Sequence, residues 1–417
     1  MMDETTLYEK ILGISAPWFV SGIEFIEPAK SVEVHVELDE GASLYCPTCG
    51  RSAPRYDKRP RRWRHLDTCQ FKTEVVAEVP RVQCSEHGVQ TVEVPWAQDN
   101  SRYTVLFEAM VIMLLKESTV SSVGRLVGLS WNAVDGIMQR AVQRGLSRRS
   151  RPALRHIGVD EVAFQKRHEY VTVVHDAQGH VVHVGEQRSG ASLGEFYEAL
   201  SEAQKAQIQS ISMDMWPAYI GATCEHLPEA EHKIAFDKFH VNQHLNNAVD
   251  AVRKQEHRQF MSQGDVTLKG TKHGWLRNYG DLERRLRREI EQLSRAANKT
   301  GRAWAIKEHA KTLWAYVKRG WAERAWHRWY QWAIRSRLQP VKKVARMIKQ
   351  HLWGIINAIV LNVTNARAES INATIKILKV RARGYRNRDR FKTAILFHCG
   401  GLSLMPEKYQ MGTHHNR

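Results

Sequence analysis

The sequence has few cysteines, too few acidic residues to balance its basic ones, and no long apolar run. Six cysteines in 417 residues are too few for a disulfide framework, so we expect a reduced, cytoplasmic setting. The absence of an apolar run of about 18 residues argues against a membrane span. The first residues also lack the basic and apolar segments of a secretory signal. The 43% hydrophobic content excludes a wholly disordered chain, and the length predicts two or more folded units.

The charge excess points to a polyanionic partner. The chain carries 62 Lys+Arg against 44 Asp+Glu, a net charge of +18. Residues 253–349 hold 25 basic and 8 acidic residues with seven of the 13 Trp, and residues 367–392 hold 9 basic and 2 acidic residues. The 253–349 stretch has helical periodicity. It fits a bundle with Trp in its core and a basic skin, a surface that binds the DNA backbone, or both.

Two short motifs near the N-terminus predict one structural zinc ion. Cys46-Pro-Thr-Cys49-Gly is followed by Cys84-Ser-Glu-His87-Gly, and two such pairs supply the four ligands of a tetrahedral zinc site. The alternative is two unrelated turns with free thiols. Cys69 has no partner in this scheme. The basic run 58–64 between the motifs could contact DNA phosphates or simply be solvated; its candidate contacts are Arg61, Arg62 and Arg64.

A helix-turn-helix pattern follows at residues 121–138. The sequence predicts a short helix, a turn at Gly128 and a second helix that begins after Ser130, a favourable N-cap. Trp131 and Asn132 at the exposed start of the second helix would face the major groove. Helix pairs of this kind also occur without any role in DNA binding.

Acidic residues follow three predicted strands in the middle of the chain. Strand-like runs end at Asp160, Asp214 and Asp237, and two further strands and a helix separate the first two of these residues. Three strands, a helix and another strand is the order of a ribonuclease-H-like sheet. Adjacent strand ends could hold Asp160 and Asp214 around Mg²⁺, a hard cation that prefers carboxylate oxygens.

A third acid is expected from a later helix. The segment 365–376 contains one acid, Glu369, and Asn372 shares its helix face. Two Mg²⁺ ions could activate an attacking oxygen and stabilise a leaving one. For each of these acids taken alone, the alternative is a turn cap or a surface charge.

Together these segments resemble the bacterial insertion-sequence transposases of the ISL3 family. The resemblance rests on the zinc unit, the helix-turn-helix and the segments 157–161, 212–219, 236–241, 365–372 and 382–387. It implies a ribonuclease-H-like core of the DDE type with Asp160, Asp214 and Glu369 as the catalytic triad. Residues 253–349 would then be a helical insertion that splits the core. The positions that match motifs near the triad, with supporting roles, are Asp237, His240 and Asn372.

We therefore expect an α/β multidomain DNA transposase of the bacterial cytoplasm, associated with the nucleoid. It would bind terminal inverted repeats and target DNA as a homodimer or larger assembly, and would use two Mg²⁺ (or Mn²⁺) for strand cleavage and strand transfer and one structural Zn²⁺. The expected backbone contacts are Lys376, Lys379, Arg381, Arg383 and Arg386. The expected domains are a zinc-binding domain (1–98), a helix-turn-helix (99–150), two core segments (151–252 and 350–405), the insertion (253–349) and a tail (406–417).

Two other functions fit parts of the pattern. A domesticated or inactive transposase could act as a DNA-binding regulator, but this predicts a broken triad or a truncated core, and neither is visible. An RNA-guided nuclease with a RuvC-type core also combines zinc with a ribonuclease-H-like fold. Its acids follow the order Asp, Glu, Asp with zinc late in the core, whereas here the order is Asp, Asp, Glu and the zinc motifs come first.

Overall fold

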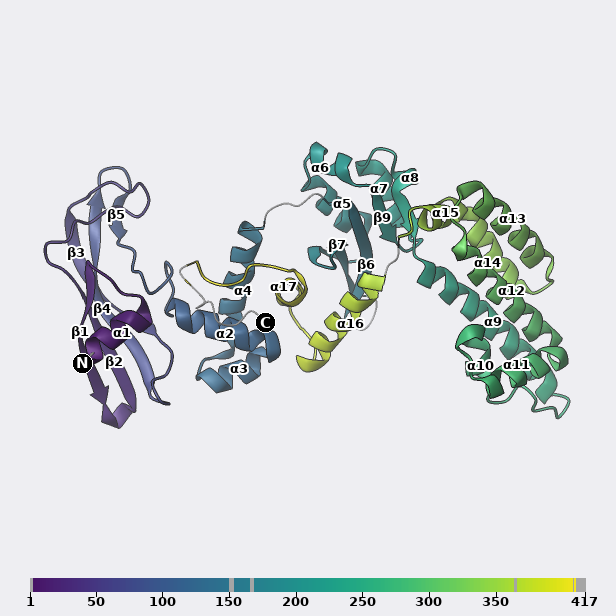
Figure 1. The fold of residues 1–417 in the computed structure, drawn as a ribbon, viewed down its shortest axis with the longest axis horizontal. Helices are drawn as coiled ribbons and strands as arrows, with labels where there is room; N and C mark the ends of the chain where they lie inside the picture. The colour runs from purple at the N-terminus through teal and green to yellow at the C-terminus, as the bar shows by residue number, and fades with distance from the viewer. Residues whose placement is uncertain (1–2, 150–153, 166–168, 364–365, 408, 410–417) are drawn as a thin grey trace. The chain divides into compact units, whose positions relative to one another are not determined.

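A computed structural model describes residues 3–149, 154–165, 169–363, 366–407 and 409. The chain forms two compact units. The first comprises residues 1–150 with residues 402–417, and the second comprises residues 151–401 (Figure 1). No helix within the described ranges is long and apolar enough to cross a membrane.

The first unit begins with a five-stranded sheet of order β1-β2-β4-β3, in which β5 pairs with β4. Alternation of β-branched and polar residues builds it, as in β2, where Val34 and Val36 are buried. Trp18 and Trp63 each pack edge-to-face on Trp96, at 5.1 and 5.4 Å between ring centroids. The elements are α1 (Glu4–Leu12), β1 (Trp18–Ile26), η1 (Glu27–Ala29), β2 (Ser31–Leu38), β3 (Arg55–Arg64), β4 (Lys72–Cys84) and β5 (Gly88–Thr91).

Three helices follow the sheet, and the second and third form the predicted helix-turn-helix. The hydroxyls of Thr119 and Ser130 cap the two helices by accepting from backbone amides. Gly128 ends the first helix with φ +67°, and a Cβ on Gly124 would lie 2.9 Å from the carbonyl oxygen of Leu129. Glycine is therefore required for this close turn. The helices are α2 (Val105–Glu117), α3 (Val120–Val127) and α4 (Trp131–Ser147).

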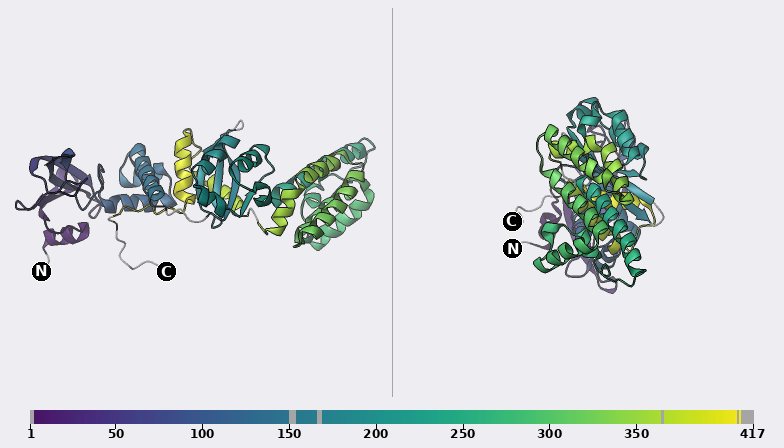
Figure 2. Two further views of the ribbon diagram at one scale, coloured as in Figure 1. Left: turned by 90° about the horizontal axis from the view of Figure 1, so that it is seen from above. Right: turned by 90° about the vertical axis from the view of Figure 1, so that its right-hand side faces the viewer.

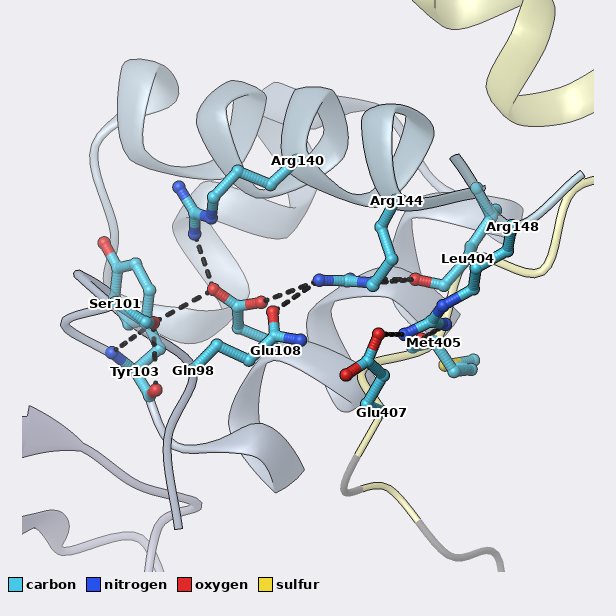
Figure 3. A network of polar contacts seen from close by, with 10 residues as sticks. All are labelled: Gln98, Ser101, Tyr103, Glu108, Arg140, Arg144, Arg148, Leu404, Met405 and Glu407. Carbon is cyan, nitrogen blue, oxygen red and sulfur yellow. Dashed lines mark hydrogen bonds and ion pairs between the residues drawn. The ribbon is translucent and has the colours of Figure 1, made fainter. Parts of the chain in front are cut away.

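The chain returns to the first unit after residue 401 and attaches to α4 (Figure 3). The Arg144 guanidinium donates two hydrogen bonds to the carbonyl oxygen of Leu404, at 3.1 and 2.8 Å. Glu108 on α2 is 1% exposed, lies between Arg140 and Arg144 (Figure 3) and accepts from Arg140 at 2.6 Å. Arg148 extends this row by donating to the Met405 carbonyl oxygen at 2.6 Å. Arg144 of α4 and Arg148, directly after its last residue, therefore hold the C-terminal segment.

The second unit is built on a five-stranded sheet of order β10-β9-β6-β7-β8. The hairpins β6–β7–β8 are antiparallel, whereas β9 runs parallel to β6 and β10 parallel to β9. The last parallel pair between β6 and β9 joins Gly158 to Ser212. The strands are β6 (His156–Gln165), β7 (Glu169–Asp176), β8 (Val181–Glu186), β9 (Ser210–Met213) and β10 (Ile234–Phe236).

Helices cover this sheet on both faces (Figures 1 and 2). Val159 of β6 belongs to the core cluster that contains residues of α5 and α7, whereas Val162 packs with Ile371 and Phe391 of α16 and α17. The alternation of strand side chains explains why residues three apart on β6 serve different cores. These helices are α5 (Gly190–Glu198), α6 (Glu202–Gln207), α7 (Pro217–His226), α8 (Ala230–Lys233), α16 (Ala366–Arg381) and α17 (Arg388–Cys399).

Between β10 and α16 the chain forms a helical bundle that includes the basic 253–349 stretch. Trp326 and Trp329 are buried in it, and the indole of Trp329 donates to the carbonyl oxygen of Ile306 at 2.9 Å, whereas Trp321 is 54% exposed. The Asn357 amide joins the bundle to the sheet by donating to the Ile234 carbonyl oxygen at 2.9 Å. The helices are α9 (Lys238–Met261), α10 (Lys272–Leu276), η2 (Tyr279–Asp281), α11 (Arg284–Ala296), α12 (Asn298–Thr312), η3 (Leu313–Ala315), α13 (Arg319–Arg335), α14 (Gln339–Gln350) and α15 (Leu352–Val360).

Candidate active site and zinc site

The two N-terminal motifs come together at one end of the first sheet. The ligand atoms of Cys46, Cys49, Cys84 and His87 all lie within 4.8 Å of one another. The Cys49 and Cys84 sulfurs are 3.7 Å apart, and His87 Nδ1 is 3.5 Å from the Cys84 sulfur and 3.9 Å from that of Cys46. Backbone amides that point at the sulfurs lower the pKa of Cys46 and Cys84, which favours the thiolates that bind metal. Cys69 is exposed and lies outside this group.

The arginines between the zinc motifs are engaged within the fold. Arg62 donates to Glu33 and Glu74, each at 3.1 Å. Arg64 is largely buried; it pairs with Asp67 and donates to a backbone carbonyl oxygen. Arg61 lies over the Trp63 ring and donates to the Ser101 carbonyl oxygen. A DNA phosphate would have to compete with these partners, so their role in DNA binding stays a prediction.

The remaining predicted DNA contacts lie on exposed surfaces. Trp131 is 38% exposed at the first turn of α4, and Asn132 beside it is exposed. Lys379 on α16 donates to the Ala163 carbonyl oxygen of β6. Across the described ranges, four other predicted contacts are exposed, and their side chains have no hydrogen bond or ion pair with the rest of the chain: Lys376, Arg381, Arg383 and Arg386.

Asp160 and Asp214 lie at the same level of neighbouring parallel strands. Each is two residues beyond the last parallel pair of β6 and β9, so the fold brings together two acids that are 54 positions apart in the sequence. The prediction that the first strand ends at Asp160 is wrong, because antiparallel pairing with β7 carries β6 on to Gln165. Asp160 is 8% exposed, and its Oδ2 accepts from the Asn372 amide of α16 at 2.8 Å. Burial raises the pKa of Asp160, although hydrogen bonds from the Glu161 amide and Asn372 oppose this. The hydrogen bond between Asn372 and Asp160 thus joins α16, the helix that carries Glu369, to β6.

Asp237 and His240 lie next to these acids. Asp237 caps α9, and its Oδ2 is 3.0 Å from His240 Nδ1. The hydrogen bond to Asp237, with further attraction to Asp214 and Asp160, raises the pKa of His240 to about 9. The imidazole is therefore a cation at neutral pH, and part of the negative charge of the cluster is balanced.

Two residues that the sequence did not single out complete the cluster. Glu161 follows Asp160 on β6, and burial raises its pKa to about 6. The Arg188 guanidinium bridges Glu161 Oε1 at 3.2 Å and Asp214 Oδ2 at 3.0 Å. Glu161 could have been noticed as the acid beside Asp160, but nothing around Arg188 in the sequence signals its position.

Glu369 is exposed on the first turn of α16, one turn before Asn372. Within the described ranges, groups of three or more acids, histidines or cysteines close enough to share one metal ion are the Cys/His group and the group of Glu24, Glu33 and His35, of which only Glu24 is exposed. Asp160, Asp214 and Glu369 are not such a group, so a joint role for them stays a prediction.

A zinc unit, a helix-turn-helix and an α/β domain with a cluster of acids define a class of DNA-processing proteins, and comparisons with known proteins identify the family. Residues 157–395 match a transposase family model of the ISL3 group. Residues 92–142 match the helix-turn-helix domain of transposase family ISL3, and residues 45–87 match the zinc-finger of transposases IS204/IS1001/IS1096/IS1165.

Similar proteins agree with these matches. The transposase for insertion sequence element IS1557 of Mycobacterium tuberculosis is 28% identical over 418 residues, with 93% of each chain covered. The transposase for insertion sequence element IS1001 of Bordetella parapertussis is 28% identical over 397 residues, which cover 92% of this chain and 97% of the relative. The chain belongs to the ISL3 family of transposases, and its function is that of a DNA transposase. The predicted family is confirmed, and the zinc-finger match with the Cys/His group supports a structural zinc ion.

Proposed function

We propose that the chain cuts and joins DNA at the terminal inverted repeats of an insertion sequence, with Asp160, Asp214 and Glu369 as its catalytic triad. The observation that carries this proposal is the placement of Asp160 and Asp214 at one level of adjacent parallel strands. Glu369 would complete the site from α16, which already reaches Asp160 through Asn372.

The sheet order supports a ribonuclease-H-like core. An antiparallel three-stranded meander is extended by two parallel strands that follow helical connections. Along the chain, this gives the expected succession of three strands, a helical segment and a further strand. In the proposed division, the core consists of residues 151–252 and 350–405, and the insertion of residues 253–349. Residues 1–98, 99–150 and 406–417 form the zinc domain, the helix-turn-helix and the tail.

The residues present fit a hard divalent cation. Carboxylate and amide oxygens are the donors that Mg²⁺ prefers. Glu161 Oε2 and Asn372 Oδ1 are buried without a hydrogen-bond partner among the described residues, which leaves two acceptor oxygens for a cation beside Asp160 and Asp214. Two Mg²⁺ ions, or Mn²⁺, would supply activation of the attacking oxygen and stabilisation of the leaving oxygen.

The protein's own groups have distinct tasks in this proposal. The amide of Asn372 fixes the Asp160 carboxylate by donating to one of its oxygens. His240, protonated at neutral pH and held by Asp237, offsets carboxylate repulsion and so lowers the cost of gathering the acids before DNA arrives. Asp237 and His240 are therefore supporting residues.

DNA would be held by surfaces outside the acidic cluster. The zinc domain and the helix-turn-helix would recognise the inverted repeats, with Trp131 and Asn132 facing the major groove. The unpaired cations Lys376, Arg381, Arg383 and Arg386 would contact phosphates near the active site. Because two DNA ends must be processed together, we propose a homodimer or larger assembly on DNA.

Amide variants of the three acids test this proposal. Asp160→Asn, Asp214→Asn and Glu369→Gln should each reduce cleavage of an inverted-repeat duplex in Mg²⁺ by about a thousandfold or more, with binding to the same duplex unchanged in a gel-shift assay. Glu202→Gln, at an exposed site on α6, is the matched control and should cleave normally. An acid variant that cleaves at the wild-type rate does not belong to the triad.

A further inference from the structure

The guanidinium of Arg188 occupies the middle of the acidic cluster. Arg188 lies between the end of β8 and Ser189, the N-cap of α5. Its Nη1 is 3.2 Å from Glu161 Oε1, its Nη2 is 3.0 Å from Asp214 Oδ2, and its Cζ lies 4.3 Å from the centre of the Trp216 ring. One cation therefore holds an acid from β6 and an acid that follows β9, and a single aromatic ring stacks on it.

The positive charge of Arg188 neutralises two carboxylates whose charges are poorly screened by solvent. The side chains of Arg188, Glu161 and Asp214 retain only 25%, 16% and 17% exposure. Without a counter-ion, two such carboxylates would repel each other and lose hydration. The same oxygen of Asp214 that accepts from Arg188 is a donor that a divalent cation would need.

The hydrogen-bonding capacity of Arg188 and of its partner Glu161 is only partly used within the described residues. In the part of the chain that the structure describes, neither the buried Nε of Arg188 nor the buried second carboxylate oxygen of Glu161 has a hydrogen-bond partner. A hollow of about 480 Å³ borders the guanidinium and is lined in part by Tyr170, Trp216 and Arg388. The side chain thus has room to leave Asp214 while it stays against the Trp216 ring.

We propose that Arg188 is a resident counter-ion that competes with the divalent metal for Asp214 and is displaced towards the hollow when metal binds. Arg188 is then a positioning residue. It keeps Glu161 and Asp214 together and neutralised before metal and DNA arrive, and it lowers the metal affinity of the site when no DNA is bound. The inference rests on the proposed function, because it assumes that Asp214 binds metal.

If Arg188 competes with the metal, its removal should change metal affinity in the opposite direction from a substitution that merely damages the site. If Arg188 only supported the fold, its removal would misplace Asp214 and weaken metal binding. If Arg188 competes, Arg188→Gln should bind metal more tightly, by about fivefold, the size expected for the loss of two partly exposed ion pairs. Arg188→Lys keeps the charge but has no fork to bridge two carboxylates, so its affinity should lie between those of the wild type and Arg188→Gln.

The experiment is a Mn²⁺ titration of the full chain without DNA, followed by the electron paramagnetic resonance signal of free Mn²⁺. Arg155→Gln is the matched control, because it removes an exposed guanidinium five residues before Asp160, and its affinity should equal that of the wild type. Circular dichroism checks that each variant is folded, and Arg188→Lys carries the test if Arg188→Gln is not.

The outcomes separate this inference from the proposed function. Loss of Mn²⁺ binding in Asp214→Asn together with tighter binding in Arg188→Gln supports both. Loss in Asp214→Asn with equal or weaker binding in the Arg188 variants overturns the role of Arg188 and leaves the proposed function standing. Wild-type Mn²⁺ binding that Asp214→Asn does not change contradicts the proposed metal site itself, and the inference fails with it.

Discussion

Replacement of one zinc ligand should remove the metal and unfold only the tip of the first sheet. In a tetrahedral site with Zn–S near 2.3 Å and Zn–N near 2.0 Å, two sulfurs lie about 3.8 Å apart and a sulfur and a nitrogen about 3.5 Å apart. The distances of 3.7 Å between Cys49 and Cys84 and 3.5 Å between Cys84 and His87 match these edges. The ligands are therefore already spaced for zinc.

The size of the effect follows from the number of ligands. Structural zinc sites contribute about 10–16 kcal/mol, so one ligand of four accounts for about 3 kcal/mol, or roughly a hundredfold in zinc affinity. Cys49→Ser should therefore lose its zinc to a chelator concentration that leaves the wild type with one zinc ion per chain. Cys69→Ser is the matched control, because Cys69 is exposed and outside the group.

The unfolding should stay local because the metal site has little apolar core of its own. Its cluster of buried residues contains Leu44, Ala53 and Val82, whereas Trp63 and Trp96 belong to a separate core of the same sheet. Limited proteolysis after chelation should cut between residues 44 and 53, with tryptophan fluorescence unchanged. Equal zinc content in Cys49→Ser and the wild type under chelator, or zinc loss in Cys69→Ser, would refute the assignment.

Two further predictions concern the first unit. Burial lowers the pKa of His65 to about 4 from 6.5. The neutral imidazole therefore favours the folded state fully above pH 6.5, and the free energy of unfolding should fall as the pH drops, by about 3 kcal/mol at pH 4. Urea unfolding of His65→Asn should show a smaller loss between pH 7 and pH 4, and an equal loss would contradict this. Glu108→Ala removes the buried partner of Arg140 and should cost about 3 kcal/mol in the free energy of unfolding. Glu407→Gln, at a side chain that is 76% exposed, should change it by less than about 0.5 kcal/mol, and equal effects of the two variants would contradict a role for burial.

Local signals in the sequence predicted much of the candidate site. The C-x-x-C and C-x-x-H spacing identified four residues that the structure brings within 4.8 Å of one another, because each pair is joined by one tight turn. Ser130 and Gly128 marked the ends of the two helices in the helix-turn-helix. The acids after β9 and β10, Asp214 and Asp237, were also identifiable, because each directly follows a short apolar strand run. Asp160 was identified as an acid beside such a run, but it lies within β6 and does not end it.

Other features depend on contacts between distant segments, which no local pattern carries. Arg62 and Arg64 belong to a basic run for which the sequence allowed either contact with DNA phosphates or simple solvation, yet neighbouring segments supply carboxylates and carbonyl oxygens that engage both. The partner of Arg144 is a carbonyl oxygen 260 positions later in the chain. Any residue can present a backbone carbonyl, so side-chain identity could not predict this contact.

By itself, the sequence determined which residues can bind zinc and cap helices, and that acids follow the strand runs before Asp214 and Asp237, because turns and periodicity act over a few residues. Only the tertiary structure decided which of these groups meet. Parallel pairing of β6 with β9 brings Asp160 and Asp214 to one level, and the end of β8 delivers Arg188 between Glu161 and Asp214. The register of the paired strands and the path of the chain after β8 set these distances, and both depend on the packing of the whole unit.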